Sequence, residues 1–204
     1  MISREDGSLS ESRAQHSLYI SLPCSDNIEA MISKGKNMPI KVTDKHVFFY
    51  HEWLSNFWNA PFEYKGHTFF CNEQAFMWEK AVLFGDKVME EKILVASTPQ
   101  EAKRLGRKVT PFDKEKWDFV RYQVMLDINY AKYSQVEDCK NRLLDPMFDG
   151  HAFVEASPRD RIWGIGLSVT NPNIDDPANW RGRNLLGKVI TEVRDRLVQE
   201  KNSI

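Results

Sequence analysis

Apolar residues between Cys71 and Phe84 recur every three or four positions, and Gly85 follows them. This spacing places them on one face of a helix, and glycine is common just beyond a helix end. We therefore predict a helix over 71–84 and a second, shorter helix over 86–96.

The next helix has a recognisable start. Thr98 offers a hydroxyl cap, Pro99 fits the first turn and Glu101 adds negative charge there. This predicts a helix over 99–105 with Gly106 at its end.

Three more helical patterns follow along the chain. Residues 113–133 form one broad apolar face, which predicts a long core helix. A shorter helix over 136–144 should end at Asp145-Pro146, because the residue before a proline disfavours the helical conformation. The last helix is predicted over 184–199.

Strand-like runs are short. Aromatic, β-prone runs fill 47–70 and are broken by turn residues. A strand is predicted over 152–156, a glycine-bearing strand or turn over 163–167, and an irregular loop over 171–182. Helices dominate and do not alternate regularly with strands, so we predict a helix-rich α+β domain with a few short strands and not a doubly wound sheet.

The first 45 residues differ in composition from the rest. Residues 1–17 are rich in serine and charge and poor in apolar side chains, so burial would not offset the entropy lost on ordering. Residues 18–45 show no sustained periodicity. We predict a partly disordered extension over 1–45 and one globular domain over 46–200.

The charge balance narrows the classes of partner. The chain has 28 Lys and Arg against 29 Asp and Glu, a formal net charge of -1. This gives no bulk positive field for nucleic acid or membrane, so phosphate recognition has to be local. The three cysteines and the histidines show no metal-ligand spacing, so we expect neither a metal nor a cofactor. Without a membrane-spanning run or signal peptide, we expect a cytoplasmic protein that does not contact membranes.

Polar and aromatic residues gather in three stretches, 53–62, 72–81 and 155–166. Cleavage of a nucleoside-like N-glycoside requires a carboxyl group for proton transfer, polar groups around the ribose, a flat surface for the base, and donors for phosphate. These three stretches supply all four kinds of group.

Each candidate also has a purely structural explanation. Glu73 and Lys80 share one helix face, where they could form an acid/base pair or a solvated surface. Glu155 and Asp160 flank a turn, and loop acids often only cap turns. Trp163 could stack on a purine or be a core residue whose neighbouring glycines relieve crowding.

Together the motifs resemble the NADAR (YbiA-like) family. The matching positions are an LSNF stretch at 54–57, an E-x6-K helix from Glu73 to Lys80, an EAS-x3-D-x2-WGIG loop at 155–166, and a W-x-G-x-N-x-LG ending at 180–187. They occur in family order over about three quarters of the chain.

The resemblance implies hydrolysis, without a metal, of an N-glycosidic bond. The implied substrates are ADP-ribose adducts such as ADP-ribosylated guanine, including in nucleic acid, or phosphoribosylamino-pyrimidine intermediates of riboflavin synthesis. By this analogy Glu73 is the acid/base, Lys80 assists it, and Asp160 binds the ribose or stabilises an oxocarbenium-like transition state. The substrate-binding residues implied are Asn56, Phe57, Gln74, Glu155, Trp163, Gly164, Gly166, Trp180 and Asn184, with Trp163 stacking and with Trp180 and Asn184 closing the far side.

One departure affects the choice of substrate. Many bacterial relatives begin the Glu73 helix with EHYYQ, whereas this chain has EQAFM and so places Gln74 where they have histidine. This weakens inference from the bacterial riboflavin branch. Two other classes remain open: a non-catalytic ADP-ribose or nucleotide sensor, and an interaction protein that uses exposed aromatic residues.

Overall fold

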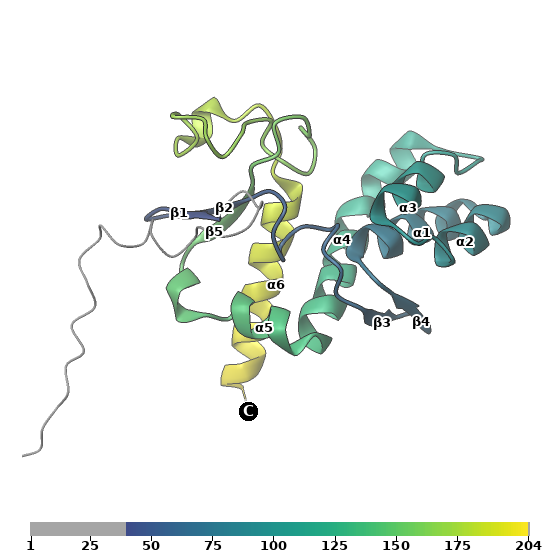
Figure 1. Cartoon of the computed structure of the whole chain (residues 1–204), viewed down its shortest axis with the longest axis horizontal. Coiled ribbons are helices and arrows are strands. Elements are labelled where there is room, and N and C mark those ends of the chain that lie inside the picture. Colours follow the sequence, from purple (N-terminus) through teal and green to yellow (C-terminus); the bar gives the residue numbers. More distant parts are fainter. Residues whose placement is uncertain (1–39, 204) are drawn as a thin grey trace, which may run out of the picture. The chain divides into compact units, whose positions relative to one another are not determined.

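The computed structural model describes residues 40–203, which form a helix-rich α+β fold (Figure 1). The fold class predicted from the sequence is confirmed. The strands are β1 (Lys41–Val42), β2 (His46–Phe49), β3 (Phe62–Tyr64), β4 (His67–Phe69) and β5 (Ala152–Glu155). The α-helices are α1 (Asn72–Phe84), α2 (Lys87–Leu94), α3 (Pro99–Gly106), α4 (Lys114–Gln135), α5 (Glu137–Leu143) and α6 (Leu185–Asn202), with short 3-10 turns at Pro146–Phe148 and Pro177–Asn179.

A three-stranded sheet joins distant parts of the chain. Its order is β1-β2-β5; β1 pairs antiparallel with β2, and β2 pairs parallel with β5. The register sets Phe49 beside Glu155, so the loops that follow β2 and β5 leave from the same edge. Ligand sites commonly form where parallel strands end together.

Helix α1 lies deep in the molecule. It packs against α2, α3 and α4, and buried residues lie all around it, including Glu73 and Gln74 as well as the apolar side chains. A helix buried on every side is a core element. Gly85 ends it in the left-handed conformation (φ 70°), as the sequence predicts.

Side-chain caps mark the starts of α3 and α4, and the one at Thr98 was predicted. The Thr98 hydroxyl accepts a hydrogen bond from the Glu101 backbone N–H, and Pro99 begins α3. Asp113 caps α4 by accepting from two backbone N–H groups. These side chains satisfy donors that a helix leaves unpaired at its start, so the local sequence alone fixes where α3 and α4 begin.

Some boundaries differ from the predictions. The stretch 163–167, predicted as a strand or a turn, forms a bent loop and no strand, because its backbone bonds close the loop: Ile165 N donates to Glu155 O and Gly166 N to Asp160 O. Lys41–Val42, within the predicted extension, pairs with β2. The predictions for residues 1–39 lie outside the described residues. None of the described helices is long and apolar enough to cross a membrane.

Candidate active site

The loop after β2 is tied to the start of α1. Asn56 is buried, and its backbone carbonyl accepts a hydrogen bond of 2.9 Å from the Glu73 backbone N–H. Below it, Asn72 Nδ2 lies 2.9 Å from Asn129 Oδ1 and 3.5 Å from Asn56 Oδ1. Buried amides joined in this way hold the loop and the helix in one arrangement.

Glu73 is a buried acid in the first turn of α1, with 5% of its surface exposed. Burial, the largest effect, raises the pKa of Glu73 to about 7, and the negative charge of Asp160 adds to this. Lys103 and Arg107 lower the pKa in opposition. The group therefore exchanges its proton near neutral pH, as a general acid or base must.

The nearby cation comes from α3. Lys103 Nζ lies 3.9 Å from Glu73 Oε1 and 5.2 Å from the centre of the Phe57 ring. Its side chain is 40% exposed. Lys103 thus joins the loop that follows β2 to the acid on α1, while its ammonium group remains accessible to a ligand.

Glu155, at the end of β5, faces the same group of charges. Its backbone N–H donates to Asn184 Oδ1 at 2.9 Å. Its Oε2 is buried and has no hydrogen-bond partner among the described residues. Burial is again the main cause that raises the pKa of Glu155, to about 8, with Asp160 and Glu73 raising it further and Lys103 lowering it. At neutral pH this carboxyl keeps its proton.

Asp160 is held by the loop it belongs to. Its Oδ1 accepts 2.8 Å hydrogen bonds from the backbone N–H groups of Ile162 and Trp163. A Cβ at Gly164 would lie 2.7 Å from Ser157 Cβ, so only glycine lets the loop pack this closely. Glu73 of α1 thus meets Glu155 and Asp160, from the end of β5 and the loop after it, and the three influence one another electrostatically.

Aromatic side chains border these carboxyls. Trp163 is half-buried, and the centre of its indole lies 5.2 Å from the centre of the Phe76 ring, edge to face. Phe76 also contacts Trp117 at 4.9 Å. These contacts fix the orientation of Trp163, so the part of its ring that stays exposed is a rigid surface on which a base could stack.

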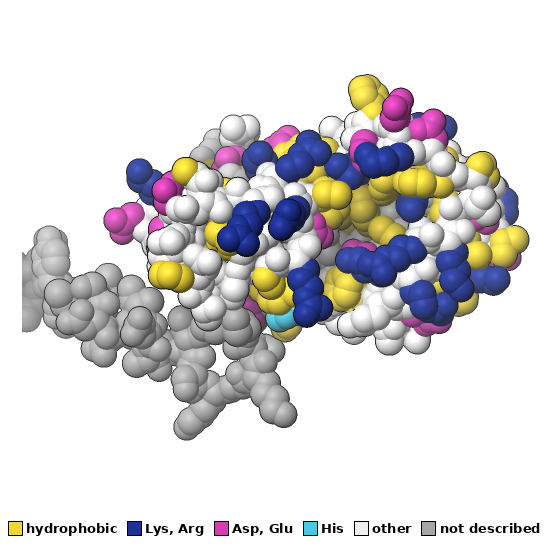
Figure 2. All heavy atoms as spheres, turned by 90° about the horizontal axis from the view of Figure 1, so that it is seen from above, with side chains coloured by type: hydrophobic (Ala, Val, Ile, Leu, Met, Phe, Trp, Pro, Cys, Tyr) yellow, Lys and Arg dark blue, Asp and Glu magenta, His cyan; other side chains and the backbone are white. Residues whose placement is uncertain are grey.

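The surface is hollowed between the α1–α3 side of the molecule and the loop that follows β5. Figure 2 shows hydrophobic and acidic side chains within this hollow and Lys and Arg side chains around it. Low dielectric surroundings strengthen charge interactions inside such a site. The protein therefore presents carboxyl groups inside a positively charged rim.

Three predicted site residues are engaged elsewhere. Lys80 Nζ donates to Gly106 O at 2.8 Å and lies over the Phe112 ring, two helical turns beyond Glu73. Gln74 uses its whole amide for the fold: Oε1 accepts from Phe70 N, and Nε2 donates to the carbonyls of Ile93 and Leu94.

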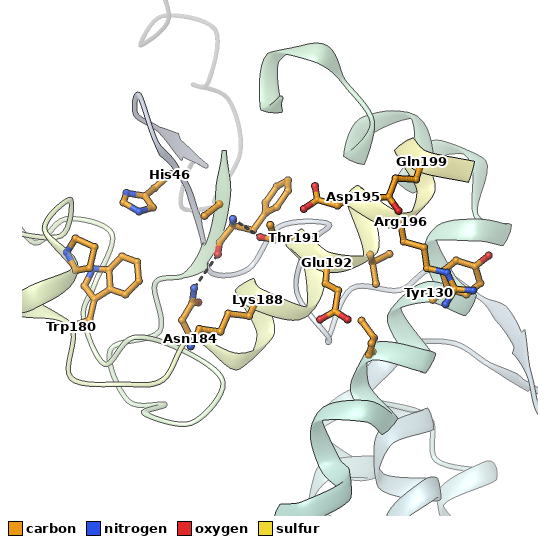
Figure 3. Close-up of a pocket in the computed structure, with 15 residues that line it drawn as sticks. His46, Tyr130, Trp180, Asn184, Lys188, Thr191, Glu192, Asp195, Arg196 and Gln199 are labelled. Atoms are coloured by element: carbon orange, nitrogen blue, oxygen red, sulfur yellow. Dashed lines mark hydrogen bonds between the residues drawn. The ribbon is translucent and has the colours of Figure 1, made fainter. Parts of the chain in front are cut away.

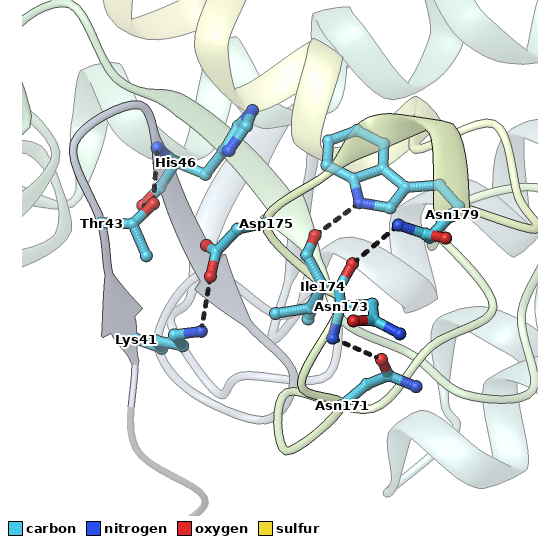
Figure 4. Close-up of polar contacts among 9 residues, drawn as sticks. Lys41, Thr43, His46, Asn171, Asn173, Ile174, Asp175 and Asn179 are labelled. Atoms are coloured by element: carbon cyan, nitrogen blue, oxygen red, sulfur yellow. Dashed lines mark hydrogen bonds and ion pairs between the residues drawn. The ribbon is translucent and has the colours of Figure 1, made fainter.

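Trp180 is the third. Its indole N–H donates to Ile174 O at 2.7 Å, and its ring meets the His46 ring edge to face (Figure 4). It lines a groove of about 690 Å³ along α6 that is lined by none of the three carboxyls (Figure 3). Of the two residues expected to close the far side of the pocket, only Asn184 contacts a site residue.

Asn184 connects the sheet to the last helix. It has a left-handed backbone (φ 53°) just before α6. Its Nδ2 donates to Phe153 O and its Oδ1 accepts from Glu155 N. The side chain therefore sets the position of Glu155 through the backbone of β5. Gly166, with φ 70°, shapes the loop beside it.

The sequence patterns missed Lys103 and Arg107. Lys103 belongs to α3 and Arg107 is the capping residue just after its end, so in the sequence both look like ordinary surface cations. Only the packing of α3 against α1 brings Lys103 to Glu73, and no spacing rule within one helix could have indicated it.

The chain is similar in sequence to known proteins. The family model described as NADAR domain matches residues 45–198. Protein irg-1 of Caenorhabditis elegans is 43% identical over 132 residues, which cover 63% of this chain and 61% of that protein; the chain thus spans about three fifths of the length of irg-1. N-glycosidase R617 of Acanthamoeba polyphaga mimivirus is 41% identical over 124 residues, 60% of this chain and 71% of that protein.

A solved structure supports the fold. The NMR structure of the Escherichia coli protein YbiA superposes with a TM-score of 0.65 at 28% identity, covering 81% of this chain and 92% of that one. The family resemblance is confirmed, and several of the matched relatives are named N-glycosidases. With more than half of its length matched by the family model, this chain belongs to the NADAR domain family.

Proposed function

We propose that this protein hydrolyses the N-glycosidic bond of ADP-ribose-type adducts, such as ADP-ribosylated guanine, or of phosphoribosylamino-pyrimidines, with Glu73 as the acid/base. The observation that carries this proposal is the buried carboxyl of Glu73, with a pKa raised to about 7 and Lys103 Nζ at 3.9 Å. A carboxyl of this pKa can give a proton and take one back at neutral pH.

The reaction needs two proton transfers. Protonated Glu73 gives its proton to the departing nitrogen while the bonding electron pair of the C–N bond moves to that nitrogen. The sugar is left as an oxocarbenium-like species. Ionised Glu73 then accepts a proton from the water whose oxygen bonds to the anomeric carbon, which regenerates the acid. The products are the free base or amine and ADP-ribose or ribose 5-phosphate.

The neighbouring residues would support these steps. The carboxylate of Asp160 would stabilise positive charge on the sugar. Glu155, protonated at neutral pH because of its pKa of about 8, could donate a hydrogen bond to a ribose hydroxyl. Trp163 would stack on the base, and Asn56 would bind sugar or base. Lys103, in place of Lys80, would supply the positive charge beside Glu73.

Product analysis by mass spectrometry tests the proposal. Wild type, Glu73→Gln and the surface control Glu91→Gln are each incubated with a guanine-ADP-ribosylated oligonucleotide and, separately, with a phosphoribosylamino-pyrimidine. We expect wild type and Glu91→Gln to release ADP-ribose or ribose 5-phosphate, and Glu73→Gln to release at least about a hundredfold less. ADP-ribose binding without any product from wild type would replace the hydrolase with a nucleotide sensor.

A further inference from the structure

Of the four exposed arginines in the loop between β5 and α6, three lie close together in the backbone, and Arg159 is the fourth. Arg161, Arg181 and Arg183 are all solvent-exposed. Among residues 40–203, none of them forms an ion pair within 4.0 Å, whereas Arg104, Arg142 and Arg196 pair with acids on their own helices. The three loop arginines therefore keep their full hydrogen-bonding capacity for a ligand.

The backbone of the loop brings the three arginines together. Arg183 N donates to Arg161 O at 2.9 Å, and Arg181 N donates to Ile165 O at 2.8 Å. Gly182, between them, packs against the backbone of Gly164 and Arg161 so closely that a side chain has no room. The backbone at Arg161 and the backbone at 181–183 are thus fixed next to each other, although they are about twenty residues apart in the sequence.

Their side chains begin on a common surface. A Cβ placed on Gly166 would lie 3.0 Å from Arg181 Cβ and 3.3 Å from Arg161 Cγ. Both stems therefore rest against Gly166, and its lack of a side chain makes room for them. Because the stems start from fixed positions, less side-chain freedom is lost when their guanidinium groups bind a ligand.

This cationic surface adjoins the reacting groups. Arg161 directly follows Asp160, whose Oδ1 is bound to the backbone of Ile162 and Trp163. Arg183 acts electrostatically on Asp118 of α4, which already pairs with Lys114 and Arg121. A ligand whose sugar contacts Asp160 would therefore lie beside the backbone segments that carry Arg161 and Arg183.

We propose that Arg161, Arg181 and Arg183 form a diphosphate-binding subsite that makes this protein select ADP-ribosyl over phosphoribosyl substrates. The inference rests on the proposed function, since it assigns that site its substrate class. Each guanidinium group can donate two parallel hydrogen bonds to phosphoryl oxygens. Two or three arginines can therefore bind both phosphates of a diphosphate, whereas a single phosphate binds fewer of them. They also offset the repulsion that the ionised carboxylates of the site exert on an anionic ligand.

Binding to the full chain tests the subsite. Calorimetry with ADP-ribose, inorganic pyrophosphate and ribose 5-phosphate is carried out on wild type, Arg161→Gln/Arg181→Gln and the charge-matched control Arg142→Gln/Arg196→Gln. We expect the loop variant to lose at least about tenfold in affinity for ADP-ribose and pyrophosphate and less than about threefold for ribose 5-phosphate, with the control unchanged. Equal affinity of the loop variant and wild type for ADP-ribose would overturn the subsite.

Two further measurements separate this inference from the proposed function. With an ADP-ribosylated substrate, loss of ground-state binding should raise KM and leave kcat nearly unchanged. Arg181→Lys, which keeps the charge without the paired donors, should give an intermediate KM and guards against misfolding of the double variant.

The outcomes for the subsite and for the hydrolase can be told apart. If wild type cleaves neither substrate but binds pyrophosphate, and the loop variant has lost that binding, the subsite is supported and the proposed hydrolase is refuted. If wild type cleaves the ADP-ribosylated substrate and the loop variant has the same KM, the hydrolase is supported and the subsite is refuted. Weaker binding of an unmodified single-stranded oligonucleotide by the loop variant, with unchanged ADP-ribose affinity, would assign the arginines to phosphodiesters and overturn the proposal.

Discussion

Lys103 Nζ lies 3.9 Å from Glu73 Oε1, and these two residues belong to helices that pack against each other. The pair is asymmetric, because the acid is buried and the lysine side chain is 40% exposed. Burial raises the pKa of Glu73 and the lysine lowers it. The value of about 7 is therefore a balance that substitution of the lysine should disturb.

The first prediction concerns the pH dependence of catalysis. Protonated Glu73 starts the proposed reaction, so kcat/KM of wild type should fall as pH rises through about 7. Lys103→Met removes a positive charge that favours the carboxylate, so the pKa of Glu73 should rise and this limb should move to higher pH. Lys103→Arg should restore the wild-type profile, and the exposed control Lys92→Met should not alter it. If the pH profile of Lys103→Met coincides with that of wild type, Lys103 does not influence the pKa of Glu73.

Lys80 provides the direct comparison with the family-based expectation. Its Nζ is engaged by Gly106 O, and it is not among the charges that shift the pKa of Glu73. Lys80→Met should therefore leave the pH of the falling limb unchanged, within about 0.2 units. A shift as large as that of Lys103→Met, measured by the same pH series, would return Lys80 to the role that the sequence first indicated.

Glu73→Gln should gain stability at alkaline pH although it loses turnover. The pKa of Glu73 is raised in the folded state from its ordinary 4.5 to about 7. The stabilising effect of this shift is complete below pH 4.5 and is lost as pH rises through about 7. The buried carboxylate then costs about 3 kcal/mol, which an uncharged glutamine avoids. Urea unfolding at pH 4 and pH 9 measures the difference in the free energy of unfolding between wild type and Glu73→Gln. If wild type is as stable as Glu73→Gln at pH 9, or more stable, water reaches the carboxyl.

Trp163 should contribute to affinity more than to chemistry. Trp163→Ala removes the stacking surface, which is worth about 1–3 kcal/mol per base in other sites, so ADP-ribose affinity should fall by roughly tenfold or more. Trp163→Phe should retain most of it. Phe119, 89% exposed on α4, supplies the control Phe119→Ala. Unchanged affinity in a folded Trp163→Ala protein, measured by calorimetry, would contradict stacking.

Gly187 should be intolerant of any side chain. A Cβ there would collide with the carbonyl oxygen of Phe153 and with the Asn184 amide, which are the groups that join β5 to α6. Gly187→Ala should therefore destabilise the fold by about 2–4 kcal/mol, measured by thermal unfolding, whereas the neighbouring exposed position should accept Lys188→Ala. If Gly187→Ala has the same melting temperature as wild type, α6 moves to accommodate the added methyl group without loss of stability.

Local signals in the sequence predicted the helices well and the assembled site only in part. The Thr98 cap and the stop at Gly85 act within one turn of helix, so their outcome could be predicted without knowing the rest of the fold. Glu73, Glu155 and Asp160 were identified by family resemblance, and the structure places them within electrostatic reach of one another. Lys103 was missed because its partner lies on another helix. Lys80 and Gln74 stood in the right motif, but their polar atoms bond to backbone groups that only the packed fold brings near.

The parallel pairing of β2 with β5 also determines when the site can form during synthesis. Helices α1 to α5 all lie between these strands in the chain, so Glu155 leaves the ribosome long after Glu73 has been made. Closing such a distant pair is slow compared with local helix formation. A nascent chain that ends before Ala152 lacks Glu155 and Asp160 and cannot assemble the three carboxyls. The proposed reaction centre therefore forms only once nearly the whole domain has been made.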